Sequence, residues 1–281
     1  MTVSVVDQAA VIASPNGGSA SERLALHRRF ADRLAVDPSL ARKVVSYQGN
    51  RQAPGFRWLK YKEGFSQKLV DDLIREFQPE AVLDPFAGIG TAPLAAAGHG
   101  RQGTGIELLP VGMEAARGIA YAANGLDPRT FKNAAQALLA HVQDGQDAPD
   151  AYAFRHVPIT EHAFPHETEP LLAKARQFLS TQDNLHVRTL LNLACMSVLE
   201  AVSYTRKDGQ YLRWDYRSGR RLRAHVHKGD ILPFLPALES RLTEMLDDLD
   251  ILKAQYGRGV PRFLPGPCLE YLPTLPDASF D

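Results

Sequence analysis

The chain has 281 residues, which is long enough for one large domain or two modest ones. Its 32 basic and 32 acidic residues cancel, so any nucleic-acid surface has to come from local clustering of charge. The two cysteines offer no disulfide framework or zinc cluster, and without a secretory signal or a long apolar run the sequence predicts a cytoplasmic protein outside the membrane.

Residues 1–45 are expected to form a helical extension. Residues 1–20 end in the flexible composition Ser14 to Ser19, and we expect them to be mobile. Ser21 and Glu22 then open an amphipathic helix whose apolar face is formed by Leu24, Leu26, Phe30 and Leu34. Asp37-Pro38 is expected to start a second short helix that reaches about Val45.

Residues 46–125 alternate between helix and strand patterns. Ser66 can cap a helix that ends before Pro79, and the short apolar run 81–83 is interpreted as a buried strand leading into Asp84. A helix over 91–97, a strand over 103–106 and a helix over 110–124 with Gly125 at its C-cap follow. Strands separated by crossover helices predict an α/β fold with a parallel sheet.

Residues 126–260 interrupt this alternation and are interpreted as a mainly helical insertion between the second and third strands. The apolar spacing predicts helices over about 167–180, 184–202 and 231–255. Residues 261–281 return to the sheet, with one helical turn followed by the beginning of another strand unit.

The most informative segment is the loop between the first strand and its helix, Asp84-Pro85-Phe86-Ala87-Gly88-Ile89-Gly90-Thr91. Two glycines let the backbone approach a ligand closely, and the following helix directs unpaired N–H groups at the loop. Glu107 ends the next strand, where a carboxylate can accept both hydroxyl hydrogens of a ribose. The alternative is a turn with a purely structural role. The loop lacks the third glycine of a dinucleotide-binding fingerprint, and it lacks the Gly-Lys-Ser/Thr of a P-loop, so neither of these sites is favoured.

This segment resembles the first motif of amino-group DNA methyltransferases, commonly Asp-Pro-Phe-x-Gly-x-Gly-Thr. The resemblance runs from about Tyr47 to Asp281 and implies a Rossmann-like methyltransferase sheet, incomplete at the C-terminus, with a helical insertion. It implies S-adenosylmethionine as cofactor, with the ribose at Glu107 and the methionine end held by Asp84, Pro85, Phe86, Gly88, Gly90 and Thr91.

Two further segments enter through the same resemblance. Tyr61 to Ser66 is similar to a segment that packs against the methionine part, which makes Lys62, Glu63, Phe65 and Ser66 candidate cofactor residues. The alternative for Lys62, Glu63 and Ser66 is a solvated turn and a helix cap. Near Cys268, backbone N–H groups could meet the adenine, although the Cys268 side chain itself is better read as a packed apolar residue.

The family's catalytic tetrapeptide, Asp/Asn/Ser-Pro-Pro-Tyr/Phe, orients the target amine and stacks on the flipped base. The sequence contains no Pro-Pro pair, whereas residues 272–281 resemble the lead-in to that motif. We therefore expect either a truncated chain or a divided enzyme in which a second polypeptide supplies the catalytic half. No catalytic residue is assigned in this chain.

A basic and aromatic segment lies between Arg206 and Lys228, with eight Lys or Arg residues and only two acids. Cations that meet phosphates and rings that stack on bases predict contact with nucleic acid, through Arg206, Lys207, Arg213, Trp214, Arg217, Arg220 and Arg221. The resemblance implies that this nucleic acid is double-stranded DNA. The alternative is a β-hairpin turning at Ser218-Gly219 with ordinary solvated arginines. The close pairs His225/His227 and His162/His166 lack metal-site partners, so no metal is expected.

The predicted activity is methyl transfer from S-adenosylmethionine to an exocyclic amino group of DNA within a restriction-modification system. The resemblance favours cytosine N4, because the expected motif begins with Ser, and adenine N6 is second. Two alternatives stay open. One is an RNA guanine-N2 methyltransferase, and the other is a non-catalytic cofactor-binding or DNA-binding subunit of a split enzyme.

Overall fold

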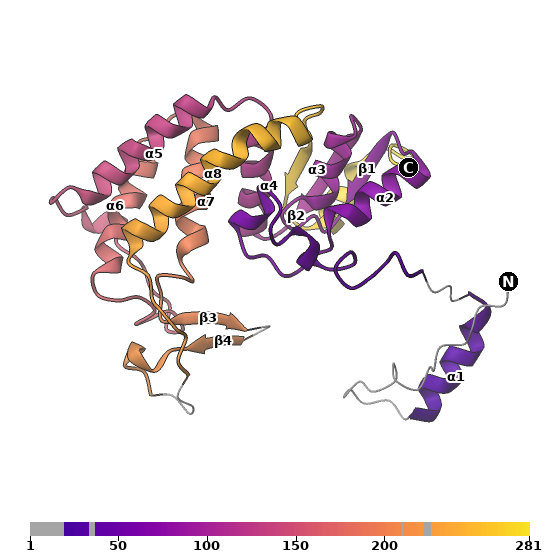
Figure 1. The fold of residues 1–281 in the computed structure, drawn as a ribbon, viewed down its shortest axis with the longest axis horizontal. Coiled ribbons are helices and arrows are strands. Elements are labelled where there is room, and N and C mark those ends of the chain that lie inside the picture. Colours follow the sequence, from indigo (N-terminus) through magenta and orange to yellow (C-terminus); the bar gives the residue numbers. More distant parts are fainter. Residues whose placement is uncertain (1–19, 34–36, 209–210, 222–225) are drawn as a thin grey trace. The chain divides into compact units, whose positions relative to one another are not determined.

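A computed structural model describes residues 20–33, 37–208, 211–221 and 226–281 (Figure 1). The chain divides into two compact units, 1–41 and 42–281. The first contains helix α1 (Ala20–Phe30) and the 3-10 turn η2 (Ala31–Arg33). The predicted α1 is confirmed, whereas Leu34 and the segment expected to be mobile up to Ser19 lie outside the described residues.

The helix predicted over 37–45 is wrong, because these residues form turns. The Asp37 carboxylate accepts a hydrogen bond from the Ser39 amide at 2.8 Å, and the Leu40 amide bonds to the Asp37 carbonyl at 3.1 Å. A local side-chain acceptor thus offers the backbone an alternative to helical bonding.

The second unit is built on a parallel sheet with strand order β1-β2-β5, made of β1 (Ala81–Asp84), β2 (Gln102–Glu107) and β5 (Arg262–Pro265). The helices α2 (Gln67–Phe77), α3 (Thr91–Gly98) and α4 (Pro110–Ala123) alternate with β1 and β2 in the chain. The fold is therefore the predicted α/β, Rossmann-like methyltransferase type.

The insertion contains α5 (Pro128–Gln143), α6 (Thr168–Ser180), α7 (Leu185–Val198) and α8 (Phe234–Tyr256), with the short turn η5 (Asp150–Tyr152). Helix α5 was not predicted, although Asp127 caps it by accepting from the Thr130 amide. Helix α4 packs against both α7 and α8, as Figure 1 shows. The insertion and the sheet half therefore share one continuous apolar core.

A two-stranded antiparallel hairpin, β3 (Thr205–Asp208) and β4 (Tyr211–Trp214), occupies the basic segment. Its strands are joined through residues 209–210, which lie outside the described residues. The alternative of a hairpin turning at Ser218-Gly219 misplaced the turn, because Gly219 ends the 3-10 turn η6 (Tyr216–Ser218) with φ 73°. The segment does contain a β-hairpin, but it is a different one, between residues 205 and 214, so this alternative is wrong as stated.

The segment after β5 contains α9 (Cys268–Tyr271) and the 3-10 turn η7 (Leu272–Thr274), which confirms the predicted helical turn. Asp281 lies at the outer edge of β1, where its amide donates to the Ala81 carbonyl at 3.1 Å. Its carboxylate accepts from the Glu80 and Ala81 amides at 2.7 and 3.1 Å. No helix in the described part of the chain is long and apolar enough to cross a membrane.

Candidate functional site

The loop between β1 and α3 depends on its two glycines. Gly88 and Gly90 have φ values of 55° and 82°, which side-chain-bearing residues rarely adopt. A Cβ on Gly88 would lie 2.9 Å from Tyr61 Cε1, and one on Gly90 would lie 2.9 Å from Phe263 Cζ. The loop therefore turns tightly against two aromatic rings, one from the segment before α2 and one from β5.

Glu107 ties this loop to the end of β2. One carboxylate oxygen accepts from the Gly88 amide at 2.7 Å, and the other accepts from the Leu109 amide at 2.6 Å. The residue is only 8% exposed. Since each carboxylate oxygen has two acceptor positions, both oxygens keep one position for a further hydroxyl donor.

Asp84 ends β1 beside Glu107. Its carboxylate accepts from the Phe86 amide at 3.0 Å, which fixes the first turn of the loop. Burial raises the pKa of Asp84 above its ordinary value, and the nearby negative charge of Glu107 raises it further. The ionised form of Asp84, at the start of the loop, is therefore less favourable in the folded protein than in water.

The end of β5 completes this edge of the sheet, because the Gly266 amide donates to the Glu107 carbonyl at 3.0 Å. Cys268 starts α9 and is partly exposed. Leu108 and Leu269, next to Glu107 and Cys268, leave 62% and 79% of their surface in solvent. Neither leucine was predicted from the sequence as a candidate site residue. The available signal was position, since Leu108 directly follows Glu107 and Leu269 directly follows Cys268.

The segment before α2 divides into residues that face the loop and residues that do not. Ser66 is buried, donates to the Val44 carbonyl at 2.6 Å and accepts from the Leu69 amide as the cap of α2. Its hydroxyl thus serves the helix cap, the alternative weighed from the sequence. Glu63 forms an ion pair with Lys207 at 3.0 Å, and the Lys62 ammonium lies 3.5 Å from the Lys207 carbonyl.

A cavity of about 420 Å³ lies beside the loop. It brings together loop residues, the segment before α2 and one hairpin arginine, and its lining includes Asp84, Phe86, Thr91, Tyr61, Lys62, Glu63, Phe65 and Arg206. Six of the predicted cofactor residues are not part of this lining, namely Ser66, Pro85, Gly88, Gly90, Glu107 and Cys268.

A buried carboxylate that sequence reasoning missed anchors the 3-10 turn η4 (Phe56–Trp58) to α8. Asp248 has no exposed side-chain surface and accepts from the Gly55 amide at 3.0 Å and from Trp58 Nε1 at 2.7 Å. Arg57 Nη2 pairs with its other oxygen at 2.5 Å. Asp248 lies in a run with Asp247 and Asp250, so nothing in the sequence distinguished it from a solvated acid.

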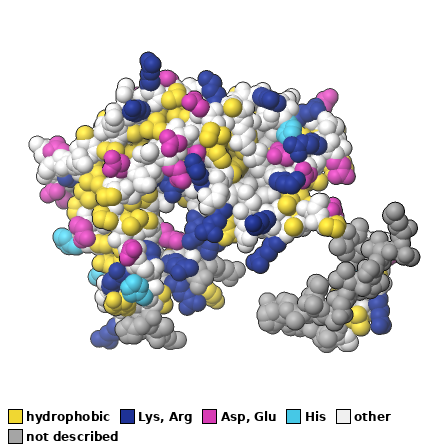
Figure 2. Space-filling model, viewed as in Figure 1, with side chains coloured by type: hydrophobic (Ala, Val, Ile, Leu, Met, Phe, Trp, Pro, Cys, Tyr) yellow, Lys and Arg dark blue, Asp and Glu magenta, His cyan; other side chains and the backbone are white. Residues whose placement is uncertain are grey.

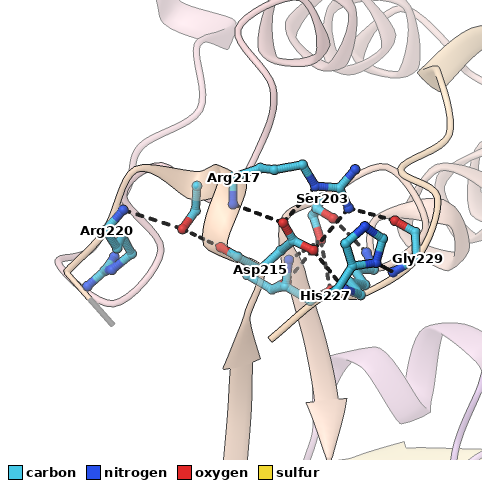
Figure 3. A network of polar contacts seen from close by, with 9 residues as sticks. Ser203, Asp215, Arg217, Arg220, His227 and Gly229 are labelled. Atoms are coloured by element: carbon cyan, nitrogen blue, oxygen red, sulfur yellow. Dashed lines mark hydrogen bonds and ion pairs between the residues drawn. The ribbon is translucent and has the colours of Figure 1, made fainter. Parts of the chain in front are cut away.

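The basic segment is organised around the buried side chain of Asp215 (Figure 3). This carboxylate accepts from Arg217 Nε at 2.7 Å, from Arg217 Nη2 at 2.9 Å and from the Lys228 amide at 2.7 Å. Hydrogen bonds from the Arg217 guanidinium hold the pKa of Asp215 well below its ordinary value.

Arg220 also has partners within the protein. Its guanidinium lies 4.2 Å from the centre of the Trp214 ring and donates to the Pro158 and Glu161 carbonyls at 3.2 and 2.8 Å. Arg217 and Arg220 therefore stabilise the fold of the segment that they were expected to present to DNA. Arg206, Lys207, Arg213 and Arg221 are exposed to solvent.

Histidines gather around a second cavity of about 760 Å³ near the start of α6. His156 contacts Glu169 at 2.9 Å, and His162 and His166 line the same cavity. Within the described residues, no group of three His, Cys, Asp or Glu side chains could hold a metal ion. His225, of the pair His225/His227, lies outside the described residues.

Comparison with known proteins gives relatives that share most of this chain. The type II methyltransferase M.AvaI of Nostoc sp. (strain PCC 7120 / SAG 25.82 / UTEX 2576) is 36% identical over 274 residues, which cover 92% of this chain and 55% of the relative. M.AvaI of Anabaena variabilis gives the same values. M.BsoBI of Geobacillus stearothermophilus is 33% identical over 285 residues, covering 92% of this chain and 54% of the relative.

No family model and no solved structure matches the chain. The chain spans about half the length of the curated relatives that it matches. The sequence similarity covers 92% of the chain. The chain is therefore a homologue of the bacterial type II methyltransferases.

Proposed function

We propose that the chain binds S-adenosylmethionine and forms the cofactor-binding half of a site-specific DNA methyltransferase in a bacterial restriction-modification system. The observation that carries this proposal is the loop from Asp84 to Thr91, held by Glu107 at the carboxyl ends of β1 and β2. Open parallel sheets bind ligands at this edge. The protein would act on DNA in the cytoplasm, the compartment that the sequence favours.

The residues at this edge fit the three parts of the cofactor. The loop N–H groups and the start of α3 suit the methionine carboxylate, and the free acceptor positions of Glu107 suit the ribose hydroxyls. Leu108 and Leu269 offer exposed apolar surface for the adenine, beside the backbone of Cys268. Bound there, S-adenosylmethionine supplies a methyl group on a positively charged sulfur.

The chain's own contribution to transfer is to hold this methyl donor while a target amine approaches. The sequence has no Pro-Pro pair, so the tetrapeptide that orients the amine has to come from another segment or a second polypeptide. We propose that its strand pairs with the outer edge of β1. An apolar groove of about 660 Å³ follows that edge and is lined by Leu69, Leu73, Phe77, Val82 and Leu83 of α2 and β1.

The substrate is proposed to be double-stranded DNA, bound in part by the hairpin β3–β4. Arg206, Lys207, Arg213 and Arg221 are exposed cations there, whereas Trp214, Arg217 and Arg220 also form contacts within the protein. An amino group is the proposed acceptor, with cytosine N4 ahead of adenine N6.

The test is transfer of labelled methyl groups from S-adenosylmethionine to plasmid DNA. The 281-residue chain alone should transfer none. Adding the polypeptide that carries the Pro-Pro-aromatic strand should restore transfer, and nucleoside mass spectrometry should find N4-methylcytosine. Robust transfer by the chain alone would show that the catalytic site has been misplaced, and a methyl group on cytosine C5 would contradict the amino-group assignment.

A further inference from the structure

The cavity beside the glycine loop has an unusually cationic lining. Among its described lining residues there are two acids, Glu63 and Asp84. Against them stand five cations, namely Arg51, Arg57, Lys60, Lys62 and Arg206. Figure 2 shows Lys and Arg side chains gathered on this face of the molecule. An excess of positive charge in a hollow concentrates the field there, which favours an anionic ligand.

Three of these five cations already have partners. Arg57 pairs with Asp248 and with Glu244, at 2.5 and 3.5 Å. Lys60 pairs with Glu200 at 2.7 Å, and Lys62 lies 3.5 Å from the Lys207 carbonyl. Within the described part of the chain, no ion pair or side-chain hydrogen bond engages the guanidinium of Arg51 or Arg206. These two exposed arginines are the lining cations that have room for a new anion.

Arg51 belongs to a well-anchored segment, since it directly follows the 3-10 turn η3 (Tyr47–Asn50). Its neighbour Asn50 is buried, donates to the Phe65 carbonyl at 3.2 Å and accepts from the Gln67 amide at 2.7 Å. A few residues later, η4 is fixed to α8 by Asp248. The backbone that carries Arg51 is therefore held on both sides.

Arg206 reaches the same cavity from the hairpin, where it lies opposite Arg213 across β3 and β4. The neighbouring Lys207 forms the ion pair with Glu63 that joins the hairpin to the segment before α2. Two guanidinium groups from separate elements thus line one cavity, and the elements are tied together beside it.

We propose that Arg51 and Arg206 bind the DNA backbone phosphates that flank the base entering this cavity. This inference rests on the proposed function. Guanidinium groups match phosphate oxygens in geometry and stay charged at any physiological pH. A base that leaves the duplex brings its flanking phosphates to the mouth of the pocket that receives it. The methionine carboxylate is served instead by the loop and the start of α3.

The test compares Arg51→Ala, Arg206→Ala and the double variant with the wild-type chain. The control is Arg129→Ala, since Arg129 is exposed on α5 and is not part of the cavity lining. Anisotropy titrations use a labelled duplex of about 20 base pairs at several salt concentrations. Each cavity variant should bind roughly tenfold more weakly and lower the log–log salt slope by about one, and the double variant should lower it by about two.

Arg206→Lys, which keeps the charge, should recover most of the salt slope. S-adenosylmethionine affinity should be unchanged in every cavity variant. A loss of cofactor affinity with unchanged DNA binding would assign the two arginines to the methionine carboxylate and overturn the proposal. The proposal would also be overturned if the cavity variants bound DNA with the same affinity and salt dependence as Arg129→Ala. A folded wild-type chain that binds neither ligand would contradict the proposed function itself.

Discussion

Glu107 has two roles at the scale of single residues. It accepts hydrogen bonds from the Gly88 and Leu109 amides, and we propose that its remaining acceptor positions bind the ribose hydroxyls. Asp84 sits beside it with a pKa raised by burial. Both carboxylates hold the backbone of the loop, and burial makes the ionised form of Asp84 unfavourable as well.

Glu107→Ala should weaken S-adenosylmethionine binding by about 1.5–3 kcal/mol, because hydrogen bonds to a charged acceptor are lost. Calorimetric titration measures this loss, and Glu270→Ala on α9 is the control because Glu270 is an exposed acid near the same edge. Equal affinities of the two folded variants would remove Glu107 from the cofactor site.

Asp84→Asn should stabilise the fold at neutral pH while it weakens cofactor binding. The raised pKa means that the ionised form is disfavoured in the folded state, so a neutral amide removes that cost. The gain should be present at pH 7 and should disappear as pH falls to about 4, where the carboxyl becomes protonated. Urea unfolding at both pH values measures it. A gain that is independent of pH would have another origin.

At the scale of elements, two buried carboxylates fix irregular segments to the helical framework. Asp248 joins η4 to α8, and Asp215 organises the segment that follows the hairpin. Each has hydrogen-bond donors from both backbone and side chain. Removing such an acid leaves several donors without acceptors in a buried environment, which costs far more than removing an exposed ion pair.

Asp248→Ala should lower the free energy of unfolding by about 3 kcal/mol, since it leaves Arg57 and the Trp58 indole N–H without their acceptor. Asp247→Ala, at the exposed neighbouring position on α8, should change it by less than about 0.5 kcal/mol. Chemical denaturation of both variants tests this contrast. Similar values for the two positions would contradict the anchoring role.

Arg217→Ala should destabilise the hairpin segment, because Asp215 then stays buried without its ion pair. The pKa of Asp215 is lowered in the folded state, so its contribution is complete above about pH 4 and is lost only as pH falls further. Hydrogen exchange at pH 7 should show faster opening of β3 and β4 in this variant. Unchanged hydrogen exchange, together with a weaker salt dependence of DNA binding, would instead assign Arg217 to DNA contact.

At the scale of the whole molecule, local patterns predicted the sheet half well. The cap at Ser66, the small-residue helix after Gly90 and the strand ending at Glu107 each have a short-range cause, so the sequence identifies them directly. The helix predicted over 37–45 is absent, because a hydrogen bond to the Asp37 side chain replaces helical bonding there. The helix α5 and the position of the hairpin turn were also missed from the sequence.

The site was harder to predict where long-range packing decides a side chain's role. Arg217 and Arg220 were predicted as DNA contacts from a basic run, and the sequence did not reveal that Asp215, Trp214 and three backbone carbonyls also engage them. From the sequence Asp248 resembles a solvated acid, and its buried role depends on the packing of η4 against α8. Arg51 had no motif to mark it, and only the cavity brings it together with Arg206.

The central claim is that S-adenosylmethionine binds at the carboxyl ends of β1, β2 and β5. The most direct measurement is photocrosslinking of labelled cofactor to the 281-residue chain, followed by mapping of the modified peptides. We predict label on peptides that contain Phe86, Leu108 or Cys268, and its loss when unlabelled S-adenosylhomocysteine competes. Label confined to the peptides around the second cavity, between Asp147 and Ala173, would contradict the account.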